Sequence, residues 1–276
     1  MIRIGLDLGC TRHKFVMIDK DRITDHRIIP SEPIDRIDRE YLEHIFGMAV
    51  SSRTQIYSTG GRSRQIAYDS SLSVTVVNEL MAIAGGGRFF LPESERFLSI
   101  SVGTGTCMVM VDHGHYRHLG GTGIGGGTLE GLSRLCLGLT PNHRFTDLFD
   151  LARQGRLEEV DITVMDVVGS GIGIVPPDAS ASHLAKLSPT TRPESVALGL
   201  INLVATEIAN LAAFCTRNYS ISQVVFIGSL IQNSFFTSIL KSRLGIINPG
   251  CVPFFPSDPA LGNALGAVYS EGLIQD

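Results

Sequence analysis

Two glycine- and threonine-rich segments of this chain contain the residues best suited to bind a phosphate group. The first occupies residues 5–14, after a strand-like opening, and the second occupies residues 101–106, after the apolar run 97–100. Glycine lets backbone N–H groups turn toward an anion without a Cβ clash, and successive N–H groups in a turn form a concave anion site. Two copies in the same context predict a duplicated fold that holds a polyphosphate between its halves. The candidates are Gly9, Cys10, Thr11 and Lys14 in the first segment, and Gly103, Thr104, Gly105 and Thr106 in the second.

Asp7 ends the first strand-like run, two residues before Gly9. A carboxylate at this position can hold Mg²⁺, usually through water, beside bound phosphates. Asp7 could instead cap the turn that follows, as Asx residues often do. Because Thr11 and Lys14 lie on the same loop, we favour the metal-linked role and predict a Mg²⁺ site at Asp7.

Glu79 is the strongest candidate for a catalytic carboxylate. It follows the apolar run 74–77 and begins a helix-like segment for which Asn78 is a plausible N-cap. This places it at the carboxyl end of a strand, where the ligand crevices of α/β proteins usually lie. The alternative is an ordinary first-turn acid that interacts with the helix dipole, and composition alone favours that alternative.

A third glycine cluster spans residues 120–127 and directly precedes a helix-like segment. Helix N-termini present free N–H groups and a partial positive charge, which suits phosphate. A flexible linker is the alternative. The helix that follows favours an anion site formed by Gly125, Gly126 and Gly127, with Thr128 next in sequence.

The segments that position these residues alternate between strands and helices, which predicts an α/β fold. Strand-like runs form two similar meanders, at 2–8, 14–19 and 22–29 and again at 97–102, 106–111 and 115–119. Further strands are expected at 55–57, 74–77, 224–227 (leading into Gly228 and Ser229) and 252–255. Helices are expected at 38–50, 62–69, 79–84, 128–137, 144–154, 194–217, 235–244 and 260–271. Gly85–Gly87 should loosen or end the helix that begins at Glu79, and residues 166–193 should form a long surface connection.

Composition narrows the classes of function. The chain has 276 residues, 43% of them hydrophobic, and a net charge of −4, so a large core is expected and a nucleic-acid partner is not. No apolar run of membrane-spanning length and no signal peptide is apparent in the sequence, so we expect a cytoplasmic protein without a membrane partner. The five cysteines are odd in number and lack C-x-x-C spacing, which indicates reduced thiols rather than a zinc or iron–sulfur site.

The order of these segments resembles the acetate and sugar kinase, Hsp70 and actin superfamily and, more narrowly, the type II pantothenate kinases. The resemblance covers nearly the whole chain, and the block at 120–128 is its most specific part. It implies two ribonuclease-H-like (actin-like ATPase) lobes, each a mixed sheet with flanking helices, at 1–96 and 97–276, with ATP in the cleft. The segments that carry it are Asp7-x-Gly-x-Thr-x-x-Lys14, Thr59-Gly-Gly61, Asn78-Glu79, Val102-Gly-Thr-Gly-Thr106, residues 120–128, Asp178-Ala-Ser-Ala-Ser182, Ile227-Gly-Ser229 and residues 261–267.

The resemblance also implies a reaction, in which the γ-phosphoryl group of ATP passes, with Mg²⁺, to the primary hydroxyl of pantothenate. This is the first step toward coenzyme A, and a homodimer is implied as well. Glu79 falls on the family's general base. The nucleotide would be bound by the two phosphate loops, by Gly126, Gly127 and Thr128, and by Ser229.

One departure from the family pattern concerns the acceptor site. The family usually has an arginine two residues before the glycine-rich block, where this chain has His118 beside Arg117. An imidazole that titrates near neutrality does not replace a permanently charged, bidentate donor. Either His118 donates in its place, or the acceptor differs, or activity is weak. Arg117 is the other candidate, although adjacent strand residues point to opposite faces.

Three alternatives therefore stay open at the level of sequence. The first is a kinase for another small hydroxyl acceptor, such as an amino sugar. The second is a non-catalytic nucleotide-binding regulatory protein on the same scaffold, which the missing arginine favours and the intact Asp7, Lys14 and Glu79 disfavour. The third is an ATP-driven activator of a radical dehydratase, which would need a bridging iron–sulfur cluster that the cysteine pattern does not support.

Overall fold

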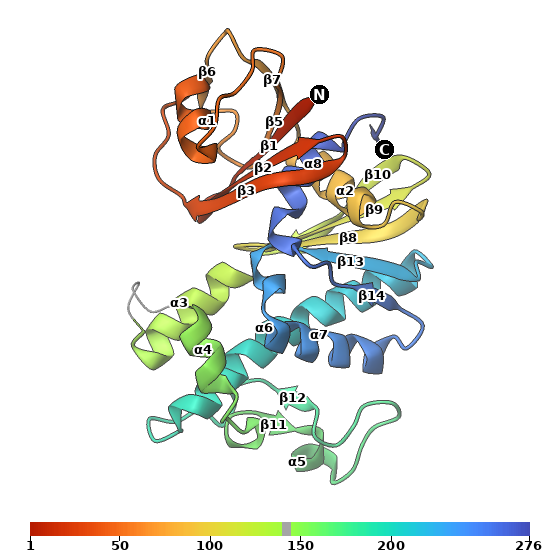
Figure 1. Ribbon diagram of the computed structural model, residues 1–276. Coiled ribbons are helices and arrows are strands. Elements are labelled where there is room, and N and C mark those ends of the chain that lie inside the picture. Colours follow the sequence, from red (N-terminus) through yellow and green to blue (C-terminus); the bar gives the residue numbers. More distant parts are fainter. Residues whose placement is uncertain (140–144) are drawn as a thin grey trace.

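The computed structural model describes residues 1–139 and 145–276 and shows two lobes, each built on a sheet (Figure 1). The N-terminal sheet has the strand order β3-β2-β1-β5-β7, and the C-terminal sheet has the order β14-β13-β8-β9-β10-β15. Both sheets begin with an antiparallel meander and continue with parallel strands. The α/β, two-lobed architecture with mixed sheets is therefore confirmed, including the duplicated meander.

The N-terminal lobe is built on the five-stranded sheet, with helix α1 packed against it. Its strands are β1 (Ile2–Leu8), β2 (Arg12–Asp19), β3 (Arg22–Pro30), β5 (Gln55–Thr59) and β7 (Ser73–Val76). Helix α1 (Arg39–Phe46) starts at Asp38, whose side chain accepts from the Tyr41 N–H, and ends at Gly47, whose φ of 67° is the left-handed conformation of a helix C-cap. It covers one face of this sheet with Leu42 and Phe46.

The C-terminal lobe is larger and carries most of the helices. Its strands are β8 (Arg96–Val102), β9 (Thr106–Asp112), β10 (His115–Thr122), β13 (Gln223–Ile227), β14 (Val252–Phe254) and β15 (Ile274–Gln275). One face of the sheet is covered by α3 (Gly126–Leu137), α4 (Phe145–Ala152), α6 (Pro193–Asn218) and α7 (Ser234–Ile247), which share a single buried cluster with β8 and β13. Helix α6 is long and apolar enough to cross a membrane, which the sequence analysis did not anticipate, but most of its apolar stretch is buried in this core.

Two further helices, α2 and α8, cross between the lobes. Helix α2 (Glu79–Phe90) follows the first sheet yet packs on the second, where Ile83 and Ala84 join Phe97 and Val109. Helix α8 (Gly262–Val268), near the C-terminus, packs on the first sheet against Val16 and Ile18. The lobe limits 1–96 and 97–276 remain a prediction, and these two helices pack across them.

Helix α2 continues through Gly85–Gly87 instead of ending there, so the expectation of a helix break is wrong. The glycines serve the contact with α8: a Cβ on Gly85 would lie 2.3 Å from the carbonyl oxygen of Gly266, and a Cβ on Gly266 would lie 1.8 Å from that of Ala82. The two helices therefore meet backbone to backbone. Helix propensity alone could not show this, because the contact partner is distant in sequence.

Several short elements also differ from expectation. The segment 62–69 forms turns and the two-residue strand β6 (Ala67–Tyr68), which pairs with β4 (Arg36–Ile37), rather than a helix. The connection at 166–193 contains the end of α5 (Val164–Val168) and the strand β12 (Ser180–Ser182), which pairs with β11 (Ile162–Thr163). Short 3-10 turns lie at Leu157–Glu159, Ser229–Gln232 and Pro259–Leu261. Residue 144, the expected start of α4, lies outside the described residues.

Candidate functional site

A cavity of about 610 Å³ lies where the two glycine-rich turns face each other between the lobes. Its size falls within the usual range for small-molecule sites. Most of the predicted site residues line it, which confirms their proximity although not their roles. They are Asp7, Gly9, Cys10, Thr11, Lys14, Glu79, Gly103, Thr104, Gly105, Thr106, Gly126, Gly127 and Ser229.

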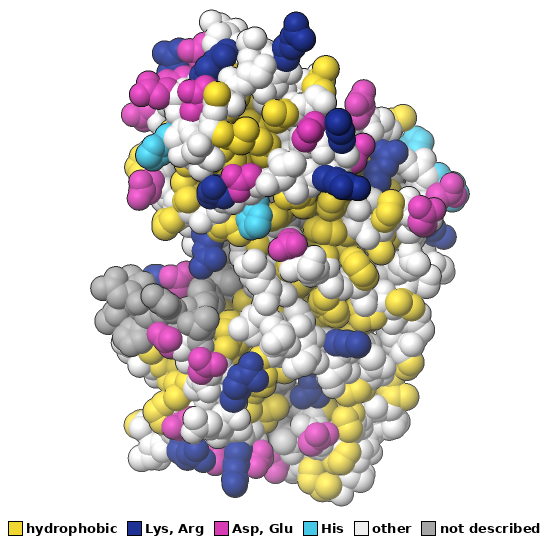
Figure 2. Space-filling model, in the orientation of Figure 1, with side chains coloured by type: hydrophobic (Ala, Val, Ile, Leu, Met, Phe, Trp, Pro, Cys, Tyr) yellow, Lys and Arg dark blue, Asp and Glu magenta, His cyan; other side chains and the backbone are white. Residues whose placement is uncertain are grey.

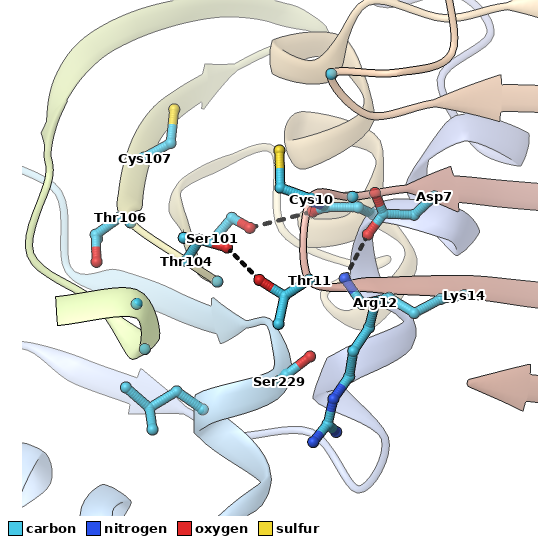
Figure 3. Close-up of a pocket in the computed structure, with 18 of the residues that line it drawn as sticks. Asp7, Cys10, Thr11, Arg12, Lys14, Ser101, Thr104, Thr106, Cys107 and Ser229 are labelled. Atoms are coloured by element: carbon cyan, nitrogen blue, oxygen red, sulfur yellow. Dashed lines mark hydrogen bonds and ion pairs between the residues drawn. The ribbon is translucent and has the colours of Figure 1, made fainter. Parts of the chain in front are cut away.

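Asp7 and Lys14 form an ion pair within the first phosphate loop. The antiparallel register of β1 and β2 places the two residues directly opposite each other, and Lys14 Nζ lies 2.6 Å from Asp7 Oδ2. The side chain of Asp7 is only 3% exposed, and that of Lys14 is 12% exposed. The pair is visible in Figure 3, where Lys14 runs along the loop toward Asp7. Lys14 is thus held by Asp7, the carboxylate that we predict to lie near Mg²⁺.

The two glycine-rich turns touch through their threonines. Thr11 Oγ1 and Thr104 Oγ1 are 3.0 Å apart, which is a hydrogen bond between residues on opposite lobes (Figure 3). Both hydroxyls are therefore directed into the space that a polyphosphate would occupy. The sequence argument that the two turns are halves of one clamp is supported by this contact.

The third glycine cluster is built differently from the expected anion site. The N–H groups of Gly126 and Gly127 are not free but donate to the carbonyl oxygens of Gly103 and Thr104, at 2.8 and 2.9 Å. A Cβ on Gly125 would lie 2.8 Å from Gly105 Cα, so glycine permits this close approach. The start of α3 thus supports the second phosphate loop from behind.

Gly125 and Thr128 do not line the cavity. Gly125 is buried at the contact with the second phosphate loop. The Thr128 hydroxyl donates to the Gly123 carbonyl oxygen at 2.7 Å and accepts from the Gly125 N–H at 3.4 Å, which caps α3. The structure therefore gives both residues a structural part at the helix start, and their predicted contact with nucleotide remains a prediction.

Glu79 begins α2 and faces the cavity, next to the Asp7–Lys14 pair. Asn78 caps the helix by accepting from the Leu80 N–H at 2.8 Å, which leaves the Glu79 side chain free of that task. Partial desolvation in the cavity wall raises the pKa of Glu79, and the Asp7 carboxylate raises it further, whereas Lys14 acts in the opposite direction. A carboxylate with a raised pKa is a better proton acceptor than an ordinary surface glutamate.

Two cysteines line the cavity from opposite lobes, Cys10 from the first loop and Cys107 from β9. Cys10 is exposed. Burial, followed by the nearby Glu79 carboxylate, raises the pKa of Cys107 to about 11. Its thiol therefore stays protonated near neutral pH, and a nucleophilic role for Cys107 has no support.

His118 and Arg117 do not line the cavity. His118 pairs with Val109 on β9, so it shares the sheet face that is covered by α2. Arg117 pairs with Met110 on the opposite face, where its guanidinium stacks 5.9 Å from the centre of the Tyr219 ring. The alternation expected from sequence is confirmed, and it places Arg117 away from Glu79. A catalytic role for either residue remains a prediction, and the geometry favours His118 over Arg117.

Several residues that line the cavity were not singled out from sequence. Arg12 lies between Thr11 and Lys14, in a segment whose glycine, threonine and lysine drew attention first. Asn263, at the start of α8, accepts a hydrogen bond from the Ser101 hydroxyl at 3.3 Å. The polar residues Thr122, Gln232 and Asn233 also line the cavity, as does Gly61 of the Thr59-Gly-Gly61 segment. Arg12 could have been found from its two-residue spacing to Lys14, because such residues share a strand face.

Comparison with known proteins agrees with this geometry. A type II pantothenate kinase of Bacillus cereus is 29% identical, over 96% of this chain and 96% of its own length. A type II pantothenate kinase of Staphylococcus aureus is 25% identical, over 98% of this chain and 100% of its own length. Among solved structures, the activator of 2-hydroxyisocaproyl-CoA dehydratase from Clostridium difficile, with bound ADPNP, has a TM-score of 0.67 at 18% identity, covering 99% of this chain and 94% of that one.

Two sheets with crossing helices and a cleft between glycine-rich turns define a protein of the actin-like ATPase fold, as the structural comparison also shows. Within that fold, residues 91–242 match the Fumble family. The match spans more than half of the described chain, and the chain belongs to the Fumble family.

Proposed function

We propose that this protein is an ATP-dependent kinase that phosphorylates the primary hydroxyl of pantothenate, the first step of coenzyme A biosynthesis. The observation that carries the proposal is the convergence of the Thr11–Thr104 contact, the Asp7–Lys14 pair and Glu79 on one cavity. Similarity to type II pantothenate kinases along nearly the whole chain supports this acceptor.

In this proposal, each group has a distinct task. The threonine hydroxyls and the backbone of the two turns position the phosphates, and Lys14 supplies positive charge beside them. Glu79 accepts the proton of the acceptor hydroxyl as that oxygen attacks the γ-phosphorus. Its raised pKa suits this step, because a stronger base takes the proton more readily.

The residues present also fit a Mg²⁺ ion that is held mainly by the nucleotide. No group of three or more His, Cys, Asp or Glu side chains suited to a metal occurs among residues 1–139 and 145–276. Mg²⁺ commonly binds through one or two carboxylates, waters and substrate phosphates, and Asp7 is the carboxylate that would hold it here. When bound, the ion would neutralise charge on the phosphates.

A kinase for a different small hydroxyl acceptor is the second candidate, and one observation favours it. Arg117 stacks on Tyr219 on the far face of the sheet, and His118 lies outside the cavity lining. The acceptor therefore meets no arginine at the position where the family resemblance implies one. An amino sugar, which lacks the carboxylate of pantothenate, would not need that arginine.

An ADP-release assay separates these candidates. The purified protein is incubated with ATP, Mg²⁺ and pantothenate, pantetheine or a panel of sugars and amino sugars. Turnover with pantothenate supports the main proposal, and turnover only with a sugar supports the second. Nucleotide binding without turnover on any acceptor would favour the regulatory role instead. The His118→Arg variant restores the arginine that the family usually has at this position. Faster turnover of pantothenate by this variant would support a place for His118 at the acceptor.

We also propose that the protein is cytoplasmic and forms a homodimer, as the family resemblance implies. The apolar face of α6 is buried in the core and is not available for this contact. Large apolar side chains are exposed instead between Met165 and Val175, including Val167 and Ile174. A Val167→Lys/Ile174→Lys variant that stays folded but elutes as a monomer in light-scattering chromatography would support this surface, and an unchanged dimer would exclude it.

The charge distribution agrees with a small-molecule substrate. On the face in view in Figure 2, basic and acidic side chains are interspersed rather than gathered into a basic stripe. A nucleic-acid partner, which is not expected from the net charge, gains no support from this surface.

A further inference from the structure

Arg12 is a cation of the cleft that the family resemblance does not explain. The first-loop motif of the family, Asp7-x-Gly-x-Thr-x-x-Lys14, specifies Asp7, Gly9, Thr11 and Lys14. It allows any residue at the position of Arg12. In the structure, Arg12 nevertheless lines the same cavity as these four residues. Figure 3 shows its side chain extending from the first phosphate loop toward Ser229 of the other lobe, away from Asp7.

The backbone that carries Arg12 is held on both sides. On one side, Thr11 contacts Thr104 across the cleft, and its carbonyl oxygen accepts from the Ser31 N–H at 3.0 Å. On the other side, the fully buried His13 contacts the Glu32 carbonyl oxygen through Nε2 at 3.0 Å. Because strand residues alternate, His13 enters the core while Arg12 and Lys14 take the opposite face. The direction of the Arg12 side chain thus follows from a fixed strand rather than from a free loop.

The charges around the cavity show why this arginine matters. Its lining contains three carboxylates, on Asp7, Glu79 and Glu130, and two basic side chains, on Arg12 and Lys14. Lys14 is already paired with Asp7, and Glu130 is paired with Arg134 outside the cavity. In the described part of the chain, Arg12 is the cavity-lining cation that has no ion-pair partner. Without Arg12, a polyphosphate would enter a site with an excess of negative charge.

We propose that Arg12 binds the terminal phosphates of the nucleotide and supplies a fixed positive charge during phosphoryl transfer. This inference rests on the proposed kinase function and assigns a further residue to its nucleotide site. A guanidinium stays charged at all relevant pH values and can donate two parallel hydrogen bonds to a phosphate. Arg12 approaches from the lobe that carries the first loop, so it would flank the phosphates on the side opposite to the α3 glycines.

Calorimetric titration of nucleotides, with Mg²⁺ present, tests this role without relying on turnover. The variant Arg12→Gln should weaken ATP binding about 10- to 100-fold, the range of a charge-assisted hydrogen bond. AMP, which lacks the terminal phosphates, should lose much less affinity. Arg12→Lys should fall between the wild type and Arg12→Gln, because it retains the charge but not the bidentate geometry. The matched control is Arg22→Gln, which removes an exposed arginine at the far end of the same sheet and should bind ATP normally.

The outcomes separate this inference from the function on which it rests. If the wild-type protein binds ATP and Arg12→Gln binds it equally well, the role of Arg12 is refuted while the kinase proposal stands. If Arg12→Gln weakens AMP and ATP equally, contact with the terminal phosphates is refuted. If the folded wild-type protein binds no nucleotide, both proposals fail together. An unchanged circular dichroism melting curve for Arg12→Gln would show that any loss of affinity is local.

Discussion

The Asp7–Lys14 pair provides the sharpest test of how the cleft is built. Replacing Lys14 by Met removes the charge and keeps the apolar stem, which leaves the Asp7 carboxylate without its partner. Asp7 is only 3% exposed, so water cannot replace the lost ion pair without a rearrangement. Removing one partner of a buried pair typically costs about 3–5 kcal/mol. For a chain of this size, that corresponds to a fall in melting temperature of roughly 6–10 °C.

Denaturant unfolding of four proteins measures this effect. We expect Lys14→Met to lower the free energy of unfolding by about 3–5 kcal/mol. The double variant Asp7→Leu/Lys14→Met should regain most of this stability, because no unpaired charge remains. Both variants should lose nucleotide binding, so stability and binding separate in the double variant. Lys241→Met, which removes an exposed lysine on α7, serves as the control and should change stability by less than about 0.5 kcal/mol. A Lys14→Met protein as stable as this control would refute the reasoning.

Three further variants and a pH–rate profile test the catalytic carboxylate and the helix crossing. Glu79→Gln should reduce turnover about 10²–10⁴-fold with little change in ATP affinity, and an unchanged kcat would return Glu79 to a helix-dipole role. Because the pKa of Glu79 is raised, wild-type turnover should fall with decreasing pH at a higher pH than for an ordinary glutamate, and a pH–rate profile without that acidic limb would count against the base. Gly266→Ala should destabilise the protein by at least about 2 kcal/mol, since its Cβ would lie 1.8 Å from the Ala82 carbonyl oxygen. The control Gly245→Ala lies on the exposed side of α7, where no atom is within 4 Å of a new Cβ, and should instead stabilise the protein by about 0.5–1 kcal/mol. If thermal melts show the same effect for Gly266→Ala and Gly245→Ala, the close contact between α2 and α8 is contradicted.

Much of the fold could be predicted from the sequence because its signals are local. The two meanders follow from alternating apolar runs with turn residues between them, and α6 follows from helical periodicity over a long segment. That the two glycine-rich turns face each other also followed from sequence, because they occur in matching places of a duplicated fold, whereas the Thr11–Thr104 hydrogen bond between them is a finding of the structure.

The remaining features depend on contacts between residues that are distant in sequence. Gly85–Gly87 looked like a helix end because glycine has low helix propensity, whereas in the structure the missing side chains admit α8. Gly126 and Gly127 looked like a free helix N-terminus, but their N–H groups are bonded to a loop that precedes them by more than twenty residues. Asn263 was missed because nothing in its local sequence reveals that it lines the cavity, whereas Arg12 has a usable signal in its two-residue spacing to Lys14.

The crossing of α2 and α8 has a consequence for the order in which the protein can fold during synthesis. The α8 face of the first sheet is covered by residues that are synthesised long after the strands of that sheet. Val16 and Ile18, which are fully buried in the folded protein, therefore lack part of their cover until Leu265 has been made. The N-terminal lobe cannot complete its core as an independent early unit, and a nascent chain keeps this apolar face partly exposed until α8 has been synthesised.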